Sequence, residues 1–252
     1  MTDMSHTRPG GFAQAAALAP VRFTAPTALP PKAQPESPIY ARAGEIFNDA
    51  HYAHPAPPLS LGARDMTVPE GIPDLCYIRL PIKRPGSEEF TLPPELAFLQ
   101  PLIEECAAYQ KAYFPDFKGR HADLILRTGL KGSVNQKVGE FHANDIEDIY
   151  FSKPQPHQSY FWTSSHPVLY SAQAYPPIPQ GATADDLTDY FNAQTDKNAA
   201  HSINPRTLHV IDNYHVHAKP PVPAGTHRTM IRICFAPYAD PVPGASVNPW
   251  LS

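Results

Sequence analysis

The sequence has few cysteines, no excess of basic residues and no long apolar run. Each of these absences argues against a class of protein. Its 3 cysteines lie far apart, which argues against a disulfide framework or zinc knuckle and predicts a reducing, cytoplasmic setting. The formal net charge of −4 argues against nucleic-acid binding, because that function needs a basic face against phosphate. No apolar stretch approaches the roughly 20 residues that span a bilayer, and no secretory signal is recognisable.

Proline and histidine are abundant instead. The 32 prolines interrupt long helices and central strands wherever they fall. The 12 histidines matter because imidazole is the commonest transition-metal ligand and titrates near neutral pH. We predict a flexible arm over residues 1–37, which are rich in Ala, Pro, Thr and Ser, and one domain over 38–252, which begins with a helical and strand extension.

The spacing of apolar residues predicts a mainly β domain with flanking helices. Spacings of three and four predict a helix over 91–114, capped by Thr91 and kinked or split at Pro101. A shorter helix is expected over 185–194. The expected strands lie at 74–82, 122–130, 149–152, 158–162, 168–175, 207–217 and 228–237. Short strands with Pro/Gly turns are typical of an antiparallel sandwich or jelly roll.

Two of these strands carry polar side chains in a regular pattern. If TLHVIDNYHVH is one regular strand, His215 and His217 share a face with other polar residues. In RTMIRICF, Arg228 and Arg232 face one way and the intervening apolar residues the other. A buried arginine needs an anion, and its planar fork suits a carboxylate. The arginine face is therefore either the lining of a polar cavity or an exposed strand face.

The segment VIDNYHVHAKPPVPAGTHRTMIRICF resembles the C-terminal part of the Fe(II)/2-oxoglutarate-dependent dioxygenases, in particular their taurine-dioxygenase-like branch. In that family a distal metal histidine shortly precedes an arginine that grips the oxoglutarate carboxylate, a pattern matched by His217 and Arg228. The proximal half of the family's site is a His-x-Asp or His-x-Glu after a strand and a glycine-rich loop. His142, in LILRTGLKGSVNQKVGEFHAND, matches that histidine. The resemblance covers residues 120–240 and implies a double-stranded β-helix, the jelly roll that cupins also adopt.

The resemblance implies a two-histidine, one-carboxylate iron site. We expect His142, Asp145 and His217 to hold Fe(II), although the family's acid position is occupied by Asn144. Asp145 would reach the metal through a one-residue bulge. Two other arrangements are open: Asn144 binding through its carbonyl oxygen, or no protein carboxylate, as in halogenating members of the superfamily.

Further residues are candidates for the same site. His215 is an alternative distal ligand, and the His-x-Asp of His121 and Asp123 ranks lower because it begins a strand. Arg228 and Arg232 are the residues expected to bind 2-oxoglutarate. The candidate substrate-binding residues are Arg127, Asn144, Trp162 and His215.

The predicted function is therefore a non-haem Fe(II)/2-oxoglutarate oxygenase. It would hydroxylate an unactivated C–H bond of a small polar metabolite with O₂, releasing CO₂ and succinate. The alternatives are a halogenase-like member of the superfamily, a cupin-like metalloenzyme that does not use 2-oxoglutarate, and a binding or structural β-sandwich. The expected partners are a small-molecule substrate and O₂, without nucleic acid or membrane, and a homodimer is left open. The residues do not identify the substrate.

Overall fold

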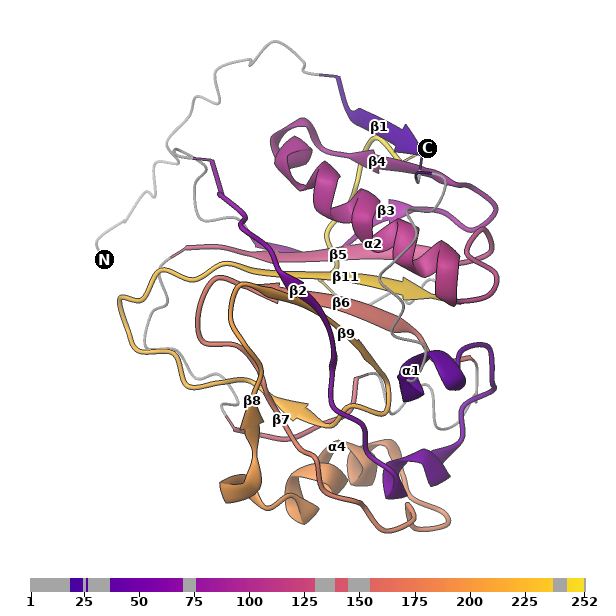
Figure 1. Cartoon of the computed structure of the whole chain (residues 1–252), viewed down its shortest axis with the longest axis vertical. Coiled ribbons are helices and arrows are strands. Elements are labelled where there is room, and N and C mark those ends of the chain that lie inside the picture. Colours follow the sequence, from indigo (N-terminus) through magenta and orange to yellow (C-terminus); the bar gives the residue numbers. More distant parts are fainter. Residues whose placement is uncertain are drawn as a thin grey trace, which may run out of the picture.

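The protein is described from a computed structural model, which covers residues 19–24, 26, 37–69, 76–129, 139–144, 155–237 and 244–251. It is mainly antiparallel β-structure with few helices (Figure 1). The largest sheet has 6 strands in the order β2-β9-β6-β11-β5-β3. These strands are β2 (Leu59–Ala63), β3 (Cys76–Lys83), β5 (His121–Arg127), β6 (Gln158–Thr163), β9 (Thr207–Asp212) and β11 (Met230–Ala236).

Two smaller sheets accompany the large one. One pairs β1 (Val21–Thr24) with β4 (Glu89–Leu92). The other has the order β10-β7-β8, from β10 (His217–Ala218), β7 (Leu169–Tyr170) and β8 (His201–Ser202). His142 adds to this second sheet through an isolated antiparallel bridge to His217. From β5 onward the chain therefore passes back and forth between the large sheet and this small one.

The helices lie at the edges and faces of the sheets. They are α1 (Pro38–Ala41), α2 (Gln100–Tyr113) and α4 (Ala184–Gln194), with 3-10 turns η1 (Asp49–Ala53), η2 (Pro94–Leu99) and η3 (Lys197–Ala199). None of the helices in the described ranges is long and apolar enough to cross a membrane. The helix predicted at 185–194 is confirmed, and Thr183 caps it through a reciprocal pair of bonds with Asp186.

The main core lies between α2 and one face of the large sheet. Strand alternation sends Leu124 and Leu126 of β5, and Ile231 and Ile233 of β11, toward α2, where all four are buried. Burial of each such side chain contributes about 2 kcal/mol. The small sheet lies on the opposite side of the large sheet (Figure 1). Side chains that alternate away from α2 therefore face the space between the two sheets.

The structure corrects two sequence predictions about elements, the Thr91 cap and the strand over 168–175. The helix predicted over 91–114 is divided as expected beside Pro101, where η2 ends and α2 begins, but Thr91 belongs to β4 and is not its cap. Most of residues 1–37, predicted as an arm, lie outside the described residues, and the described part includes β1. The strand expected over 168–175 is only the short β7. The strand expected over 149–152 lies outside the described residues.

The strand predicted over 207–217 is also wrong as one regular strand. β9 ends at Asp212, and β10 begins at His217 in the other sheet. Between them Asp212 Oδ1 accepts the Tyr214 N–H at 3.0 Å, and the Asp212 carbonyl accepts the His215 N–H at 3.2 Å. Asp and Asn favour such turns because their short side chains hydrogen-bond to nearby backbone. This turn changes the environment of each histidine that follows it.

Candidate functional site

A cavity of about 170 Å³ lies between the large sheet and the small sheet. Its apolar lining comes from both sides and includes Ile125, Phe161, Val168 and Met230. Its polar lining consists of Arg127, His142, Asn144, His217, Lys219, Arg228 and Arg232. Alternation in β5, β6 and β11 produces this arrangement, because residues that point away from the α2 core point into the cavity.

His142 and His217 lie side by side in this cavity. Their backbones exchange two hydrogen bonds, each 3.0 Å long, and their ring centroids are 4.7 Å apart at an interplanar angle of 49°. Nδ1 of His217 lies 2.8 Å from the carbonyl of His215, and Nδ1 of His142 lies 3.2 Å from the carbonyl of Glu140. A ring nitrogen beside a carbonyl carries the proton, so these contacts assign Nε2 of each ring as the lone-pair nitrogen.

The electrostatic environment keeps His217 neutral. Burial lowers the pKa of His217 well below its usual value, and His142 and Arg232 lower it further. The neutral imidazole is the form that binds a metal ion. His217 therefore offers a neutral nitrogen donor.

Two arginines of the cavity have no carboxylate partner among the described residues. Arg228 is 8% exposed, and its Nε donates to the carbonyls of Ser165 and His166, each at 3.1 Å. Burial and the neighbouring charge of Arg127 lower the pKa of Arg228 to about 10. Nε of Arg127 is buried without a hydrogen-bond partner. Such a pair of desolvated cations is a site for anions.

Arg232 has partners within the chain. Its Nε donates to Ser159 Oγ at 2.9 Å, and Nη1 donates to Asn144 Oδ1 at 3.3 Å. Asn144 lines the cavity at the position where the family pattern has an acid. Asp145, the expected third ligand, lies outside the described residues. Within the described ranges no group of three His, Cys, Asp or Glu side chains is arranged to hold a metal ion.

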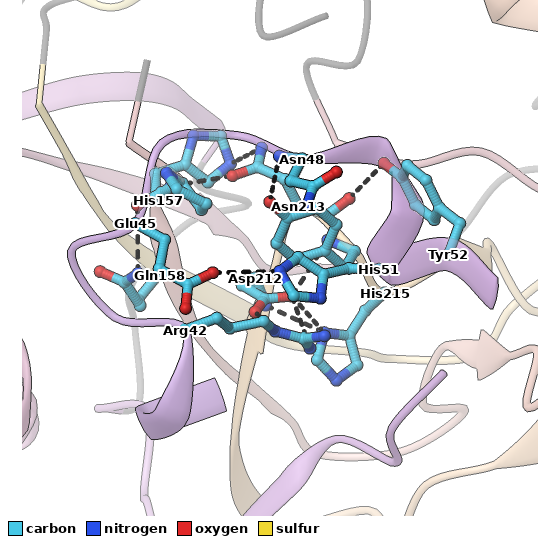
Figure 2. Close-up of polar contacts among 12 residues, drawn as sticks. Arg42, Glu45, Asn48, His51, Tyr52, His157, Gln158, Asp212, Asn213 and His215 are labelled. Carbon is cyan, nitrogen blue, oxygen red and sulfur yellow. Dashed lines mark hydrogen bonds and ion pairs between the residues drawn. The ribbon is translucent and has the colours of Figure 1, made fainter. Parts of the chain in front are cut away.

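Asn213 joins the two halves of the candidate site. It is fully buried, and its Nδ2 donates to the carbonyl of Asn144 at 2.8 Å and to Nε2 of His157 at 2.9 Å. Its Oδ1 accepts the backbone N–H of His157 at 2.8 Å, and its carbonyl accepts the hydroxyl of Tyr52 at 2.8 Å (Figure 2). One amide thus ties the segment that carries His142 to the turn before His217.

His215 does not face the cavity, which corrects its assignment as a candidate ligand or substrate contact. Figure 2 shows its ring turned toward Asp212, with Nδ1 2.8 Å from Oδ1. Arg42 donates Nε to Oδ2 of Asp212 at 2.9 Å and stacks over the ring of Tyr214 at 4.7 Å. Burial alone would raise the pKa of Asp212, but His215, Arg42 and the Tyr214 N–H outweigh burial and lower that pKa to about 2. This buried network stabilises the β9–β10 turn.

Other candidates lie elsewhere in the fold. Trp162 belongs to the α2 core, where its Nε1 donates to the carbonyl of Arg64 at 3.1 Å, so its assignment to substrate is also wrong. The adjacent Phe161 faces the cavity instead, as alternation along β6 requires. His121 and Asp123 do not line the cavity, which is consistent with their lower rank. The sequence predictions did not include Lys219 and Phe161, which both line the cavity. Alternation along β6 could have placed Phe161 on the opposite face from Trp162.

No family model and no curated protein matches the sequence. Among solved structures, the chain is similar to the crystal structure of EvdO2 from Micromonospora carbonacea var. aurantiaca, with a TM-score of 0.36 and 19% identity. That match covers 60% of this chain and 66% of the other, slightly less than two thirds of it. The chain is also similar to EvdO2 complexed with 2-oxoglutarate, with a TM-score of 0.36, 17% identity and coverage of 66% and 80%. Both matches describe a distant similarity of fold.

Proposed function

We propose that the cavity is the active site of an Fe(II)- and 2-oxoglutarate-dependent oxygenase that hydroxylates an unactivated C–H bond of a small molecule. One observation carries the proposal. His142 and His217 present neighbouring imidazoles in the same cavity as Arg228, a buried cation without a carboxylate partner among the described residues. Two imidazoles suit Fe(II), and the guanidinium suits the distant carboxylate of 2-oxoglutarate.

The path of the chain supports a double-stranded β-helix as the framework of this site. After β5 in the large sheet, His142 bonds to the small sheet, and β6 returns to the large one. Then β7 and β8 lie in the small sheet, β9 in the large, β10 in the small and β11 in the large. Repeated crossing between two antiparallel sheets is how a jelly roll is built.

The residues present fit the two cofactors. His142 and His217 would hold the iron, with Asp145 as the third ligand. Asn144 is a poorer ligand because its Oδ1 already accepts a hydrogen bond from the cation Arg232. Arg228 would bind the distant carboxylate through its terminal nitrogens, because its Nε is directed at two backbone carbonyls. The carbonyls of Ser165 and His166 thereby fix the direction of the guanidinium.

When bound, iron and oxoglutarate supply the oxidising chemistry, and the protein supplies placement and exclusion of water. The carbonyls beside Nδ1 of His142 and His217 hold each ring in one tautomer and orientation. Phe161, Val168 and Met230 make the wall between the two sheets apolar, which excludes water from the reacting centre. The same wall gives the apolar part of a substrate a surface to pack against.

Anaerobic absorption spectroscopy tests the proposal. Purified metal-free protein is mixed with Fe(II) and then with 2-oxoglutarate, and a visible charge-transfer band is expected from the chelate. The band should be absent in His217→Ala and Arg228→Met. His227→Ala is the matched control, because His227 is exposed beside Arg228 and should keep the band. Thermal melting of each variant establishes that it is folded.

Other outcomes identify the alternatives. Iron binding without a band would favour a cupin-like metalloenzyme that does not use 2-oxoglutarate. Loss of specific iron binding would favour a binding or structural β-sandwich.

Asp145→Ala tests the third ligand: we expect much weaker iron binding. Unchanged iron binding together with a chloride requirement would favour the halogenase-like alternative, for which the observation is Asn144 at the family's acid position.

A further inference from the structure

The described lining of the cavity is rich in cationic side chains. Its lining contains Arg127, Lys219, Arg228 and Arg232, and no Asp or Glu belongs to the described lining. Fe(II) and 2-oxoglutarate carry equal and opposite charges, so together they add none. A guanidinium group taken out of water requires an anion nearby, so an arginine of this lining without a carboxylate partner among the described residues is a candidate for binding a further anionic ligand.

Arg127 is the cation that the proposed function does not use. Its Nε is buried without any hydrogen-bond partner, and no carboxylate of the described residues pairs with it. Arg228 and Arg232, by contrast, each direct Nε at an acceptor of the chain. A buried donor without an acceptor is rare in a folded protein. Arg127 also lines the cavity, so a carboxylate bound there would pair with its guanidinium group.

The backbone places Arg127 beside the proposed oxoglutarate arginine. Arg127 ends β5 opposite Met230 of β11, and the Arg228 N–H donates to the carbonyl of Gly129 at 3.1 Å. The two arginines therefore come from adjacent chain segments at the same end of the large sheet. After burial, the charge of Arg127 is the cause that lowers the pKa of Arg228, so the two guanidinium groups interact.

The lining around Arg127 indicates the rest of the ligand. Ile125 precedes it on the same face of β5, and Met230 is its partner on β11. Phe161 of β6 lies opposite Arg232 and lines the same cavity. These side chains offer apolar contact rather than hydrogen bonds. A ligand that matches both features has one anionic end and an apolar body.

We propose that Arg127 binds the carboxylate of the substrate, and that the substrate class is a small organic acid with an apolar body. The assignment rests on the proposed function in one respect, because it takes Arg228 to be occupied by 2-oxoglutarate. Arg127 would then fix the substrate's orientation relative to His142 and His217. Catalysis would act on the apolar body, while the carboxylate stays at the end of β5.

Matched acids and amides test the proposal by isothermal titration calorimetry. The probes are hexanoate against hexanamide and phenylacetate against phenylacetamide, added to metal-free protein and to protein loaded anaerobically with Fe(II) and 2-oxoglutarate. At least one acid should bind the loaded wild-type protein about ten-fold more tightly than its amide, as a charge-assisted pair requires. Arg127→Met should abolish this preference, and Arg127→Lys should keep part of it. Arg206→Met, which removes an exposed arginine, should leave it unchanged.

The affinity for 2-oxoglutarate separates the two proposals. Arg127→Met should retain that affinity within about three-fold, because it removes no group assigned to oxoglutarate. If Arg127→Met loses oxoglutarate as Arg228→Met does, both arginines bind the cofactor and the substrate assignment is wrong. If neither acid is preferred over its amide, the assignment is also wrong. If acids are preferred but no iron–oxoglutarate band forms, the anion site stands and the proposed oxygenase function fails.

Discussion

At the scale of single residues, the protein contains buried or partly buried charges of two kinds. Asp212 and Arg42 are a satisfied pair, closed by His215 and the Tyr214 N–H. Arg127 and Arg228 are cations without a carboxylate partner among the described residues. The first arrangement stabilises the fold, and the second suits a ligand. Substitution of Asp212 should therefore lower the stability of the fold, whereas substitution of Arg127 or Arg228 should weaken ligand binding.

Asp212→Asn should destabilise the protein by about 3 kcal/mol, because Arg42 would remain buried without its carboxylate. Urea denaturation measures the change in the free energy of unfolding. Asp65→Asn is the control, since Asp65 pairs with Arg206 at the surface. Its effect should stay below about 1 kcal/mol. Equal losses in the two variants would show that the buried pair contributes no more than an exposed one.

The same carboxylate predicts a dependence of stability on pH. The pKa of Asp212 is about 2 in the folded protein, below its ordinary value of 3.8. Its contribution is therefore fully present above the ordinary pKa and is lost as pH falls toward the folded value. That contribution is about 2 kcal/mol. The difference in unfolding free energy between wild type and Asp212→Asn should shrink between neutral pH and about pH 3, and a constant difference would contradict the assignment.

At the scale of elements, local periodicity predicted much of the fold. It found α4 and β6 from the period of their apolar residues, and it found β3 although that strand has two shifts of register. It also found the two faces of β11. It failed over 207–217, where alternation continues through Asp212 and Asn213 although the chain turns there and changes sheet. A polar residue that alternates correctly in a strand can also fold back on its own backbone, and periodicity does not distinguish the two.

The candidate site shows the same limit. The resemblance and the spacing brought His142, His217 and Arg228 together as an expectation, and the structure places all three around one cavity. His215 was misassigned because its environment depends on Arg42, which lies 170 positions from Asp212 in the sequence. Trp162 was misassigned because its strand faces a core on one side and the cavity on the other. Contacts between distant segments decide such cases.

The side chain of Asn213 connects two elements of the candidate site, and its removal tests whether that connection matters for iron binding. Asn213→Ala removes the amide that joins the His142 segment to the β9–β10 turn. We expect Fe(II) affinity, measured by anaerobic titration, to fall about ten-fold or more because the two histidines lose their relative placement. Asn248→Ala is the matched control. It removes another buried amide, one that bonds to the carbonyls of Pro81 and Thr91, and it should leave iron affinity unchanged.

At the scale of the whole molecule, charge is distributed unevenly. The chain carries a formal net charge of −4, whereas the described polar lining of the cavity contains four cations and no carboxylate. An anion approaching from a distance is repelled by the net charge, but near the cavity it is attracted. Salt screens both effects. It slows the binding of an anion if attraction by the cavity dominates, and it speeds binding if repulsion by the net charge dominates.

We expect the association rate of 2-oxoglutarate to fall about ten-fold between low and high salt, because the local field of the cavity dominates at the entrance. Stopped-flow measurement of the charge-transfer band at several oxoglutarate concentrations gives this rate. Arg127→Met should reduce the dependence on salt. A rate that rises with salt would show that the net negative charge of the molecule controls the approach.

The bridge between His142 and His217 has a consequence for folding. The two residues are 75 positions apart (217 − 142 = 75), and reciprocal backbone bonds hold them together. Closing so long a loop costs conformational entropy before the contact forms. A metal ion held by both rings would therefore bind only after the sheets have assembled. The ion would slow unfolding and leave the folding rate almost unchanged, because it stabilises the folded protein and not the transition state of folding.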